Sequence, residues 1–316
     1  MRILARSLAL VVAAVIAVCV PASADAQVPA PLPVPYGNAY PFLDVAVHDW
    51  DGAVPGANDW SCHPSAAHPN PVVLVTSTFL SDAVNWTSLA PYLYNHGYCV
   101  YTFNYGRTPY VAPGLNGLGS IPESAQQTAD FVAQVRAATG AAKVDLVGHS
   151  QGGLVARYFI QQLGGAAVVD KMIMLSSPYS MGNLAGVDVQ QLVESLVPQV
   201  IYQAIEGSGV VPQGLVQLAD PGMWATLNGT THGLSPNVTY TEITSHTDEI
   251  GLLGGMAPPP GAANASTEYL QHYCLTDLSV HFAQPYSPTA VALIGNALDP
   301  AHPITPPCTV VPLYRP

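Results

Sequence analysis

The most informative stretch of the chain is Val144-Asp-Leu-Val-Gly-His-Ser150-Gln-Gly-Gly-Leu-Val-Ala156, which contains the G-x-S-x-G motif 148–152. A β-type segment, 144–147, precedes the motif. A helix-type segment, 154–163, follows it and ends at Gly164-Gly165. This strand–turn–helix context predicts a nucleophile elbow, in which the motif glycines let strand and helix approach closely and the Ser150 hydroxyl projects above the sheet. The alternative is a glycine-rich turn in which the serine has no role.

Strand-like and helix-like segments alternate along the rest of the chain. Apolar or alternating runs predict strands at 72–75, 98–103, 172–175 and 238–244. Helices are predicted at 86–94, at 288–298, and from the capping box Ser120-Ile-Pro-Glu123 to Gly140. This alternation predicts an α/β fold with a mostly parallel sheet and helices on both faces.

Residues 179–236 are too many for a plain crossover between two strands and predict a cap. Val189, Leu192, Val193, Leu196 and Val197 follow helical spacing and form one apolar stripe. The stripe alone fits a helix packed permanently on the sheet. Because the segment lies between Ser150 and the later catalytic residues, we expect instead a mobile lid above that serine.

The N-terminus has the features of a secretory signal. Arg2 and Arg6 precede the apolar run 8–20, and small residues at Ala22, Ala24 and Ala26 provide cleavage sites. The run is short for a membrane span, and a lipid anchor at Cys19 is disfavoured. The predicted divisions are a signal peptide (1–26), a proline-rich arm (27–59), a catalytic domain (60–308) and a tail (309–316). We expect a secreted protein, with association with the cell envelope as an alternative.

Composition narrows the possible ligands. The formal net charge of −12 argues against binding nucleic acid, whose phosphates require a basic surface. The sequence has no glycine-rich phosphate loop, and we expect no cofactor. Cleavage of the signal leaves Cys62, Cys99, Cys274 and Cys308, which predict two disulfides with three pairings open. Zinc is disfavoured because no C-x-x-C pair occurs, and no metal is expected.

A serine hydroxyl becomes a nucleophile when an imidazole takes its proton. In elbow enzymes the order along the chain is serine, acid, histidine. His281 directly precedes the last predicted helix, where such a histidine belongs, and we prefer it to His272 and His302. His149 is expected to point away from the site.

The acid is expected to follow a strand at the same edge of the sheet. Asp248 lies four residues after the strand 238–244 and is the preferred candidate. Its rivals are Glu249, which would point elsewhere if Asp248 points inward, and Asp277, which lies close to His281 in sequence.

An oxyanion requires two backbone N–H donors. One is the amide of Gln151, the residue after the serine. The second is expected from the loop after the strand 72–75, from Thr78 or Phe79, with Thr78 preferred.

A family resemblance rests on 71–75, Asn85-Trp86, 97–106, Gly148-His-Ser-Gln-Gly-Gly153, 240–249, Val280-His281 and 297–300. Over residues 60–308 the chain resembles the secreted lipases of actinobacteria. The resemblance implies an α/β-hydrolase fold, ester hydrolysis, a triad of Ser150, Asp248 and His281, and disulfides Cys62–Cys99 and Cys274–Cys308. The family usually has His-Gly where this chain has Thr76-Ser77, so Ser77 is expected to adopt a backbone conformation at a cost.

The sequence therefore predicts a secreted, cofactor-free serine hydrolase that cleaves acylglycerol esters, acting as a monomer at an oil–water interface without a membrane span. Three alternatives remain open. They are a short-chain esterase or polyester hydrolase, an acyltransferase with the same triad, and a non-catalytic binding protein of the cell envelope.

Overall fold

The computed structural model describes residues 30–36, 52–108, 114–179, 183–184, 187–188, 211–229, 234–251, 255–258 and 261–312. The chain divides into two units, 1–31 and 32–316, and all elements below belong to the second. The predicted signal peptide and the predicted lid stripe 189–197 lie outside the described residues.

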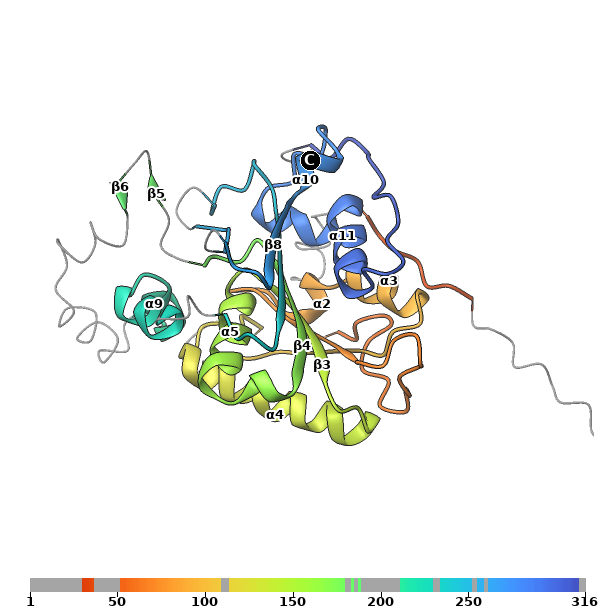
Figure 1. Cartoon of the computed structure of the whole chain (residues 1–316), viewed down its shortest axis with the longest axis horizontal. Helices are drawn as coiled ribbons and strands as arrows, with labels where there is room; N and C mark the ends of the chain where they lie inside the picture. The colour runs from red at the N-terminus through yellow and green to blue at the C-terminus, as the bar shows by residue number, and fades with distance from the viewer. Residues whose placement is uncertain are drawn as a thin grey trace, which may run out of the picture. The chain divides into compact units, whose positions relative to one another are not determined.

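A six-stranded sheet forms the centre of the second unit (Figure 1). Its strands are β1 (Val72–Val75), β2 (Val100–Phe103), β3 (Val144–His149), β4 (Val169–Leu175), β7 (Thr239–Thr244) and β8 (Ala265–Tyr269). They lie in the order β2-β1-β3-β4-β7-β8, and every neighbouring pair is parallel. All six strands therefore end at the same edge of the sheet. The expected α/β-hydrolase sheet is confirmed.

The side chains of the strands alternate between two helical layers. Val73 and Val75 of β1 face a cluster that includes α4 (Ile121–Thr139) and α5 (Gln151–Gln162). Val72 and Leu74 face a second cluster with α3 (Leu89–Asn95) and α11 (Pro288–Leu298). Both faces of a parallel sheet are covered in this way, which explains why β1 is a continuous apolar run. Figure 1 shows α4 and α5 on one side of the strands and α3 and α11 on the other.

Several expected boundaries are confirmed by local geometry. The Ser120 hydroxyl accepts a hydrogen bond from the backbone N–H of Glu123 at 3.3 Å, which caps the start of α4. Gly140 ends α4 with φ of 71°, a left-handed conformation that suits glycine. The helix expected at 86–94 begins later, at Leu89, and the short helix α2 (Asp82–Asn85) precedes it.

The strand β8 was not expected from the sequence. Its residues are Ala-Ser-Thr-Glu-Tyr, and none is fully buried, because β8 lies at the edge of the sheet. A short edge strand lacks the apolar run that marked the central strands. The remaining short elements are β5 (Asn183–Leu184), β6 (Val187–Asp188), the 3₁₀ turn η1 (Gly165–Ala167) and α10 (Leu270–Tyr273).

Two short helices lie within residues 211–229, the described part of the predicted cap near its C-terminal end. Met223, Trp224 and Leu227 of α9 (Pro221–Asn228) belong to the same apolar cluster as α5. In α8 (Gln213–Leu218), the N–H of Gly214 donates to the carbonyl of Leu118 at 3.1 Å. A Cβ on Gly214 would lie 2.7 Å from the carbonyl oxygens of both Gly117 and Gly119. Only glycine allows α8 to lie this close to the 117–119 loop.

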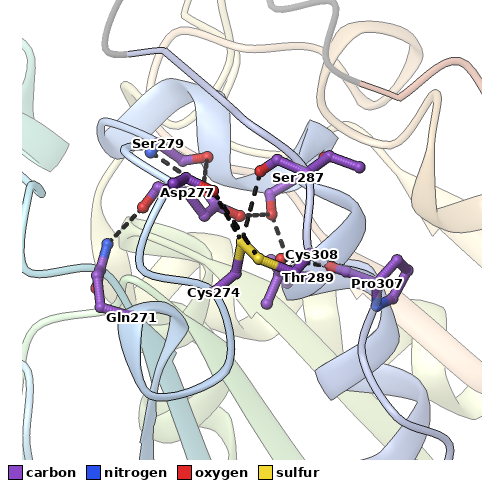
Figure 2. Close-up of a disulfide and its surroundings, with 11 residues drawn as sticks. Gln271, Cys274, Asp277, Ser279, Ser287, Thr289, Pro307 and Cys308 are labelled. Atoms are coloured by element: carbon purple, nitrogen blue, oxygen red, sulfur yellow. Dashed lines mark hydrogen bonds between the residues drawn. A yellow bond between two sulfur atoms is a disulfide. The ribbon is translucent and has the colours of Figure 1, made fainter.

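The two disulfides pair Cys62 with Cys99 and Cys274 with Cys308, as the family resemblance implied. The second bridge lies beside the buried carboxylate of Asp277 (Figure 2). Hydroxyls of Ser279 and Ser287 donate to this carboxylate, and the Gln271 amide donates to the Asp277 carbonyl at 2.6 Å. Disulfide and hydrogen bonds together anchor the segment between β8 and α11.

Loss of the second disulfide is expected to reduce both stability and activity. Cys274 and Cys308 are 34 residues apart, and the loop they close contains His281. We expect the Cys274→Ser/Cys308→Ser variant to lose about 3–4 kcal/mol of unfolding free energy in a denaturant titration. Its kcat should also fall at a temperature where it remains folded, because His281 is less well placed.

The other bridge supplies the matched control. Cys62 and Cys99 are 37 residues apart, so Cys62→Ser/Cys99→Ser should cost similar stability. Its loop contains Thr78 and not His281, so the ¹⁵N resonances of the His281 ring should stay at their wild-type positions in this variant and shift in Cys274→Ser/Cys308→Ser. Equal shifts of these resonances in both double variants would contradict the specific effect on His281.

No helix in the described part of the chain is both long and apolar enough to cross a membrane. Over the same residues, no group of three histidine, cysteine or acidic side chains is arranged to hold a metal ion.

Candidate active site

Ser150 occupies the turn between β3 and α5. Its φ of 53° and ψ of −124° are unusual for a residue with a side chain, and glycine neighbours make the turn possible. A Cβ on Gly148 would lie 2.6 Å from the N of Gly153, and one on Gly152 would lie 2.2 Å from the Val75 carbonyl. The expected elbow geometry is therefore present, with strand and helix in close contact.

Three side chains from separate loops meet at this turn. The Nε2 atom of His281 lies 2.8 Å from the Ser150 Oγ. On the other side of the ring, Nδ1 lies 3.0 Å and 3.1 Å from the two carboxylate oxygens of Asp248. Ser150 and Asp248 follow β3 and β7, which end at the same edge of the sheet, and His281 lies in the segment between β8 and α11. The structure thus brings the three sequence-predicted residues together in the order serine, histidine, acid.

The carboxylate of Asp248 is buried and well supplied with donors. Backbone N–H groups of Ile250 and Gly251 donate to Oδ1 at 2.9 Å and 3.0 Å, and the Gln284 amide donates to Oδ2 at 2.7 Å. Burial alone would raise the pKa of Asp248. Hydrogen bonds, chiefly with His281, outweigh that effect and hold its pKa below the ordinary value. The carboxylate therefore stays ionised and holds a proton on Nδ1 of His281.

The backbone of His281 is fixed by side chains at both of its polar groups. His281 begins the 3₁₀ helix η2 (His281–Tyr286). Its N–H donates to Glu249 Oε2 at 2.9 Å, and its carbonyl oxygen lies 3.2 Å from Nε2 of His149. The expectation that His149 points away from the site is wrong, because the rings of His149 and His281 lie 5.2 Å apart.

The loop after β1 lies beside the elbow. A Cβ on Gly117 would meet the Gln151 side chain at 2.7 Å and the Thr78 Cα at 3.0 Å, so Thr78 and Gln151 flank the same glycine. The N–H of Phe79 donates to Asn116, and that of Ser77 donates to the Asn85 side chain. These bonds leave the Thr78 amide as the candidate oxyanion donor from this loop.

The unfavourable backbone conformation expected at Ser77 is absent from that residue and occurs instead at Phe79. Ser77 is not among the described residues with positive φ, whereas Phe79, two positions later, has φ of 69°. The unusual backbone therefore lies on the far side of Thr78. Replacement of the family's glycine by Ser77 imposes no left-handed backbone on that residue.

The rival residues lie away from Ser150 or have other partners. The carboxylate of Asp277 is occupied by Ser279 and Ser287 (Figure 2). His302 is exposed and pairs with Asp299 at 3.0 Å. His272 lies against the rings of Tyr269 and His246. Glu249 accepts a hydrogen bond from the backbone N–H of His281, not from its ring.

Behind the triad lies a second buried carboxyl group, Glu242 of β7. Its Oε1 accepts the Ser177 N–H at 3.0 Å, and the Ser177 hydroxyl donates to the carbonyl of Ser150 at 2.7 Å. Burial, reinforced by the nearby charge of Asp248, raises the pKa of Glu242 well above the ordinary value. A protonated Glu242 thus supports the elbow through Ser177.

This raised pKa predicts a pH-dependent stability. Above the unfolded-state pKa of about 4.3, the unfolded chain releases the Glu242 proton while the folded protein keeps it, so stability falls as pH rises toward the folded-state pKa. Glu242→Gln cannot ionise and keeps the acceptor for Ser177. Its melting temperature should match wild type below the unfolded-state pKa and exceed it increasingly as pH rises from there toward the folded-state pKa. Melting temperatures should be measured by calorimetry from pH 4 to pH 8. A difference between the two proteins that stays constant with pH would refute the raised pKa of Glu242.

Sequence reasoning missed Gln284, Ser177, Glu242 and the position of His149. Gln284 is a polar residue within the otherwise apolar segment 282–286, a pattern that signals a buried hydrogen-bonded group, whereas Glu242 lies among the threonines of 239–244 and has no such signal. Their partners come from other elements of the fold, and no local spacing identifies those partners.

Known proteins are similar to parts of this chain. Residues 69–190 match the family model of class 2 lipases. Triacylglycerol lipases from Pseudarthrobacter phenanthrenivorans and Burkholderia plantarii are each 41% identical over 98 residues, 29% of this chain. The match covers 28% of the first relative and 25% of the second, so the chain spans about a quarter of the curated relatives it matches.

A solved structure supports the fold over a longer stretch. Lipase B from Aspergillus fumigatus superposes with a TM-score of 0.53 and 20% identity, covering 80% of this chain and 56% of that one. At this identity the likeness concerns the fold. Together with the parallel sheet and the serine elbow, it shows that the chain has an α/β-hydrolase fold, and residues 69–190 are similar to the class 2 lipases.

Proposed function

We propose that the protein is a serine carboxylic-ester hydrolase that cleaves acylglycerol esters. The observation that carries the proposal is the continuous contact from Ser150 Oγ through the His281 ring to the Asp248 carboxylate. In this arrangement a general base lies within hydrogen-bond distance of the nucleophile, and an ionised carboxylate orients the base.

The proposed reaction has two halves. Ser150 Oγ forms a bond to the ester carbonyl carbon while its proton passes to Nε2 of His281. The tetrahedral oxyanion accepts hydrogen bonds from the backbone N–H groups of Gln151 and Thr78. When the intermediate collapses, the C–O bond to the alcohol breaks, the alcohol takes the proton from His281, and an acyl-enzyme remains.

Water then completes the cycle. It attacks the acyl carbon, gives one proton to His281, and forms a second oxyanion at the same two amides. Collapse breaks the bond to Ser150, which recovers its proton, and releases the carboxylic acid. Throughout both halves Asp248 stays ionised and stabilises the imidazolium that forms transiently on His281.

Two observations favour a lipid ester as the substrate. The matched relatives carry the name triacylglycerol lipase. In addition, the large apolar side chains of Phe79 and Phe282 are exposed, at 40% and 41%, although each directly follows a proposed site residue. Exposed aromatic side chains at the mouth of a site suit contact with acyl chains or a lipid surface.

The location of the protein follows from separate features. The two disulfides fit an oxidising compartment, and residues 1–26 have the pattern of a secretory signal. The proposal is therefore of a secreted monomer that meets its substrate outside the cell. A lid within 179–236 is part of this proposal.

A chain-length series tests the substrate class. Initial rates on glycerol and p-nitrophenyl esters, from acetate to oleate, should be measured below and above each solubility limit. A lipase with a mobile lid should show a rise in rate when an emulsion forms. Smooth saturation through the solubility limit, with preference for acetate or butyrate, would identify an esterase with a fixed cap.

A further inference from the structure

A second imidazole lies directly behind the proposed base. His149 is the last residue of β3 and is fully buried. Its Nε2 is 3.2 Å from the carbonyl oxygen of His281, and its Nδ1 is 3.0 Å from Oδ1 of Asn85. The residue preceding the nucleophile thus contacts the backbone of the base.

The contact at Nδ1 leads to the oxyanion loop. Asn85 Oδ1 also accepts the backbone N–H of Ser77 at 3.1 Å, and Ser77 precedes the proposed donor Thr78. One imidazole therefore lies between the backbone that carries the base and the loop that carries the oxyanion donor. The reaction requires these two parts to keep a fixed spacing around one carbonyl group.

A neutral His149 can donate to only one of its two oxygen partners. Burial, and then the neighbouring His281, lower the pKa of His149 to about 3, so the neutral ring carries a single proton. The His281 carbonyl and Asn85 Oδ1 can both only accept, and we assign the proton to Nε2, toward the residue that carries the base. Asn85 Oδ1 keeps its hydrogen bond from the Ser77 N–H and contacts Nδ1 of His149 without accepting a proton from it.

The other polar group of the His281 backbone is held independently. Its N–H donates to Glu249, which follows Asp248 in sequence. The backbone N–H and carbonyl oxygen of His281 are thus both bound by side chains from other parts of the chain. With the backbone fixed at both points, the imidazole of His281 has little freedom to leave the line between Ser150 and Asp248.

We propose that His149 is a positioning residue that holds the backbone of His281 at a fixed spacing from the oxyanion loop. This role rests on the proposed ester hydrolysis. His149 contacts neither the reacting serine oxygen nor the expected position of the substrate carbonyl. Its effect should therefore reach the reaction through the geometry of His281.

The test uses two variants with different hydrogen-bonding capacity. His149→Phe keeps a planar ring but donates nothing. We expect it to lower kcat on a soluble short-chain ester by about 10- to 100-fold, with KM changed less than about twofold, because the base is misplaced. His149→Gln carries an amide donor at the end of its side chain and should recover part of the lost kcat.

Controls separate positioning from general loss of packing. Thr128→Val removes one buried hydrogen bond that lies wholly within α4, because its acceptor is the Ser124 carbonyl. It should lower the melting temperature but leave kcat unchanged. The ¹⁵N resonances of the His281 ring should shift in His149→Phe and remain at their wild-type positions in Thr128→Val.

The possible failures are distinguishable. Wild-type kcat and unchanged His281 resonances in folded His149→Phe would overturn the positioning role. Equal loss in the Phe and Gln variants would overturn it too, since the donor would then be irrelevant. If wild type neither hydrolyses esters nor reacts with an organophosphonate, the proposed function fails, and the ¹⁵N shifts still decide whether His149 positions His281.

Discussion

Replacing Ser150 with alanine is expected to lower kcat for ester hydrolysis by about 10⁴- to 10⁶-fold. In the first half of the proposed mechanism, the Ser150 hydroxyl is the group that forms a bond to the acyl carbon. The His281 ring 2.8 Å away would then have no nucleophile to activate. Hydrolysis measured at saturating p-nitrophenyl butyrate, against an enzyme-free blank, gives the ratio directly.

The fold of this variant should be intact. Alanine removes one oxygen from a partly exposed side chain, and the backbone bonds at the elbow remain. Melting temperature should stay within a few degrees of wild type. Wild type should be labelled by a fluorophosphonate and Ser150→Ala should not. Near-normal hydrolysis by a folded Ser150→Ala protein would exclude the acyl-enzyme mechanism.

Asp248→Asn is expected to lower kcat by about 10³- to 10⁴-fold. The asparagine amide can present its NH₂ group to Nδ1 of His281, which favours the tautomer with the proton on Nε2. That proton would point at Ser150 and prevent the ring from acting as a base. Hydrolysis of p-nitrophenyl butyrate at saturation, measured against an enzyme-free blank, gives this ratio.

Two neighbouring acids provide matched controls. Glu249→Gln retains an oxygen that can accept the His281 N–H, so kcat should fall less than about tenfold. Asp277→Asn disturbs the hydrogen bonds to Ser279 and Ser287 and should act mainly on stability. If Asp277→Asn were as inactive as Asp248→Asn in the folded state, the choice of acid would have to be revised.

The parts of the fold that the sequence predicted correctly are those with local signals. Val72–Val75 is apolar throughout because helices cover both faces of the sheet, and the boundaries of α4 follow from the Ser120 cap and Gly140. The elbow is predictable because close contact between strand and helix excludes every side chain at Gly148 and Gly152. The edge strand β8 has no such requirement and leaves no comparable pattern.

The arrangement of the site was predictable only through the topology. Asp248 could be chosen because parallel strands end at one edge, so a residue just beyond the end of a strand lies near Ser150. His281 could be chosen from its place before the last predicted helix. The contacts of Gln284, His149 and Glu242 depend on how loops from different strands pack. Phe79 illustrates the same limit, because its positive φ arises from the path of the loop and not from its residue type.

The close approach of Gly214 to the 117–119 loop has a consequence for protein engineering. Caps are natural targets for exchange between related enzymes when substrate range is to be altered. In this chain the cap rejoins the body through a position where any side chain would collide with two carbonyl oxygens. A transplanted cap must therefore bring a glycine in register with Gly214, or the recipient loop must be rebuilt along with it. Chimeras designed by sequence length alone would fail at this junction while their catalytic residues remained correct.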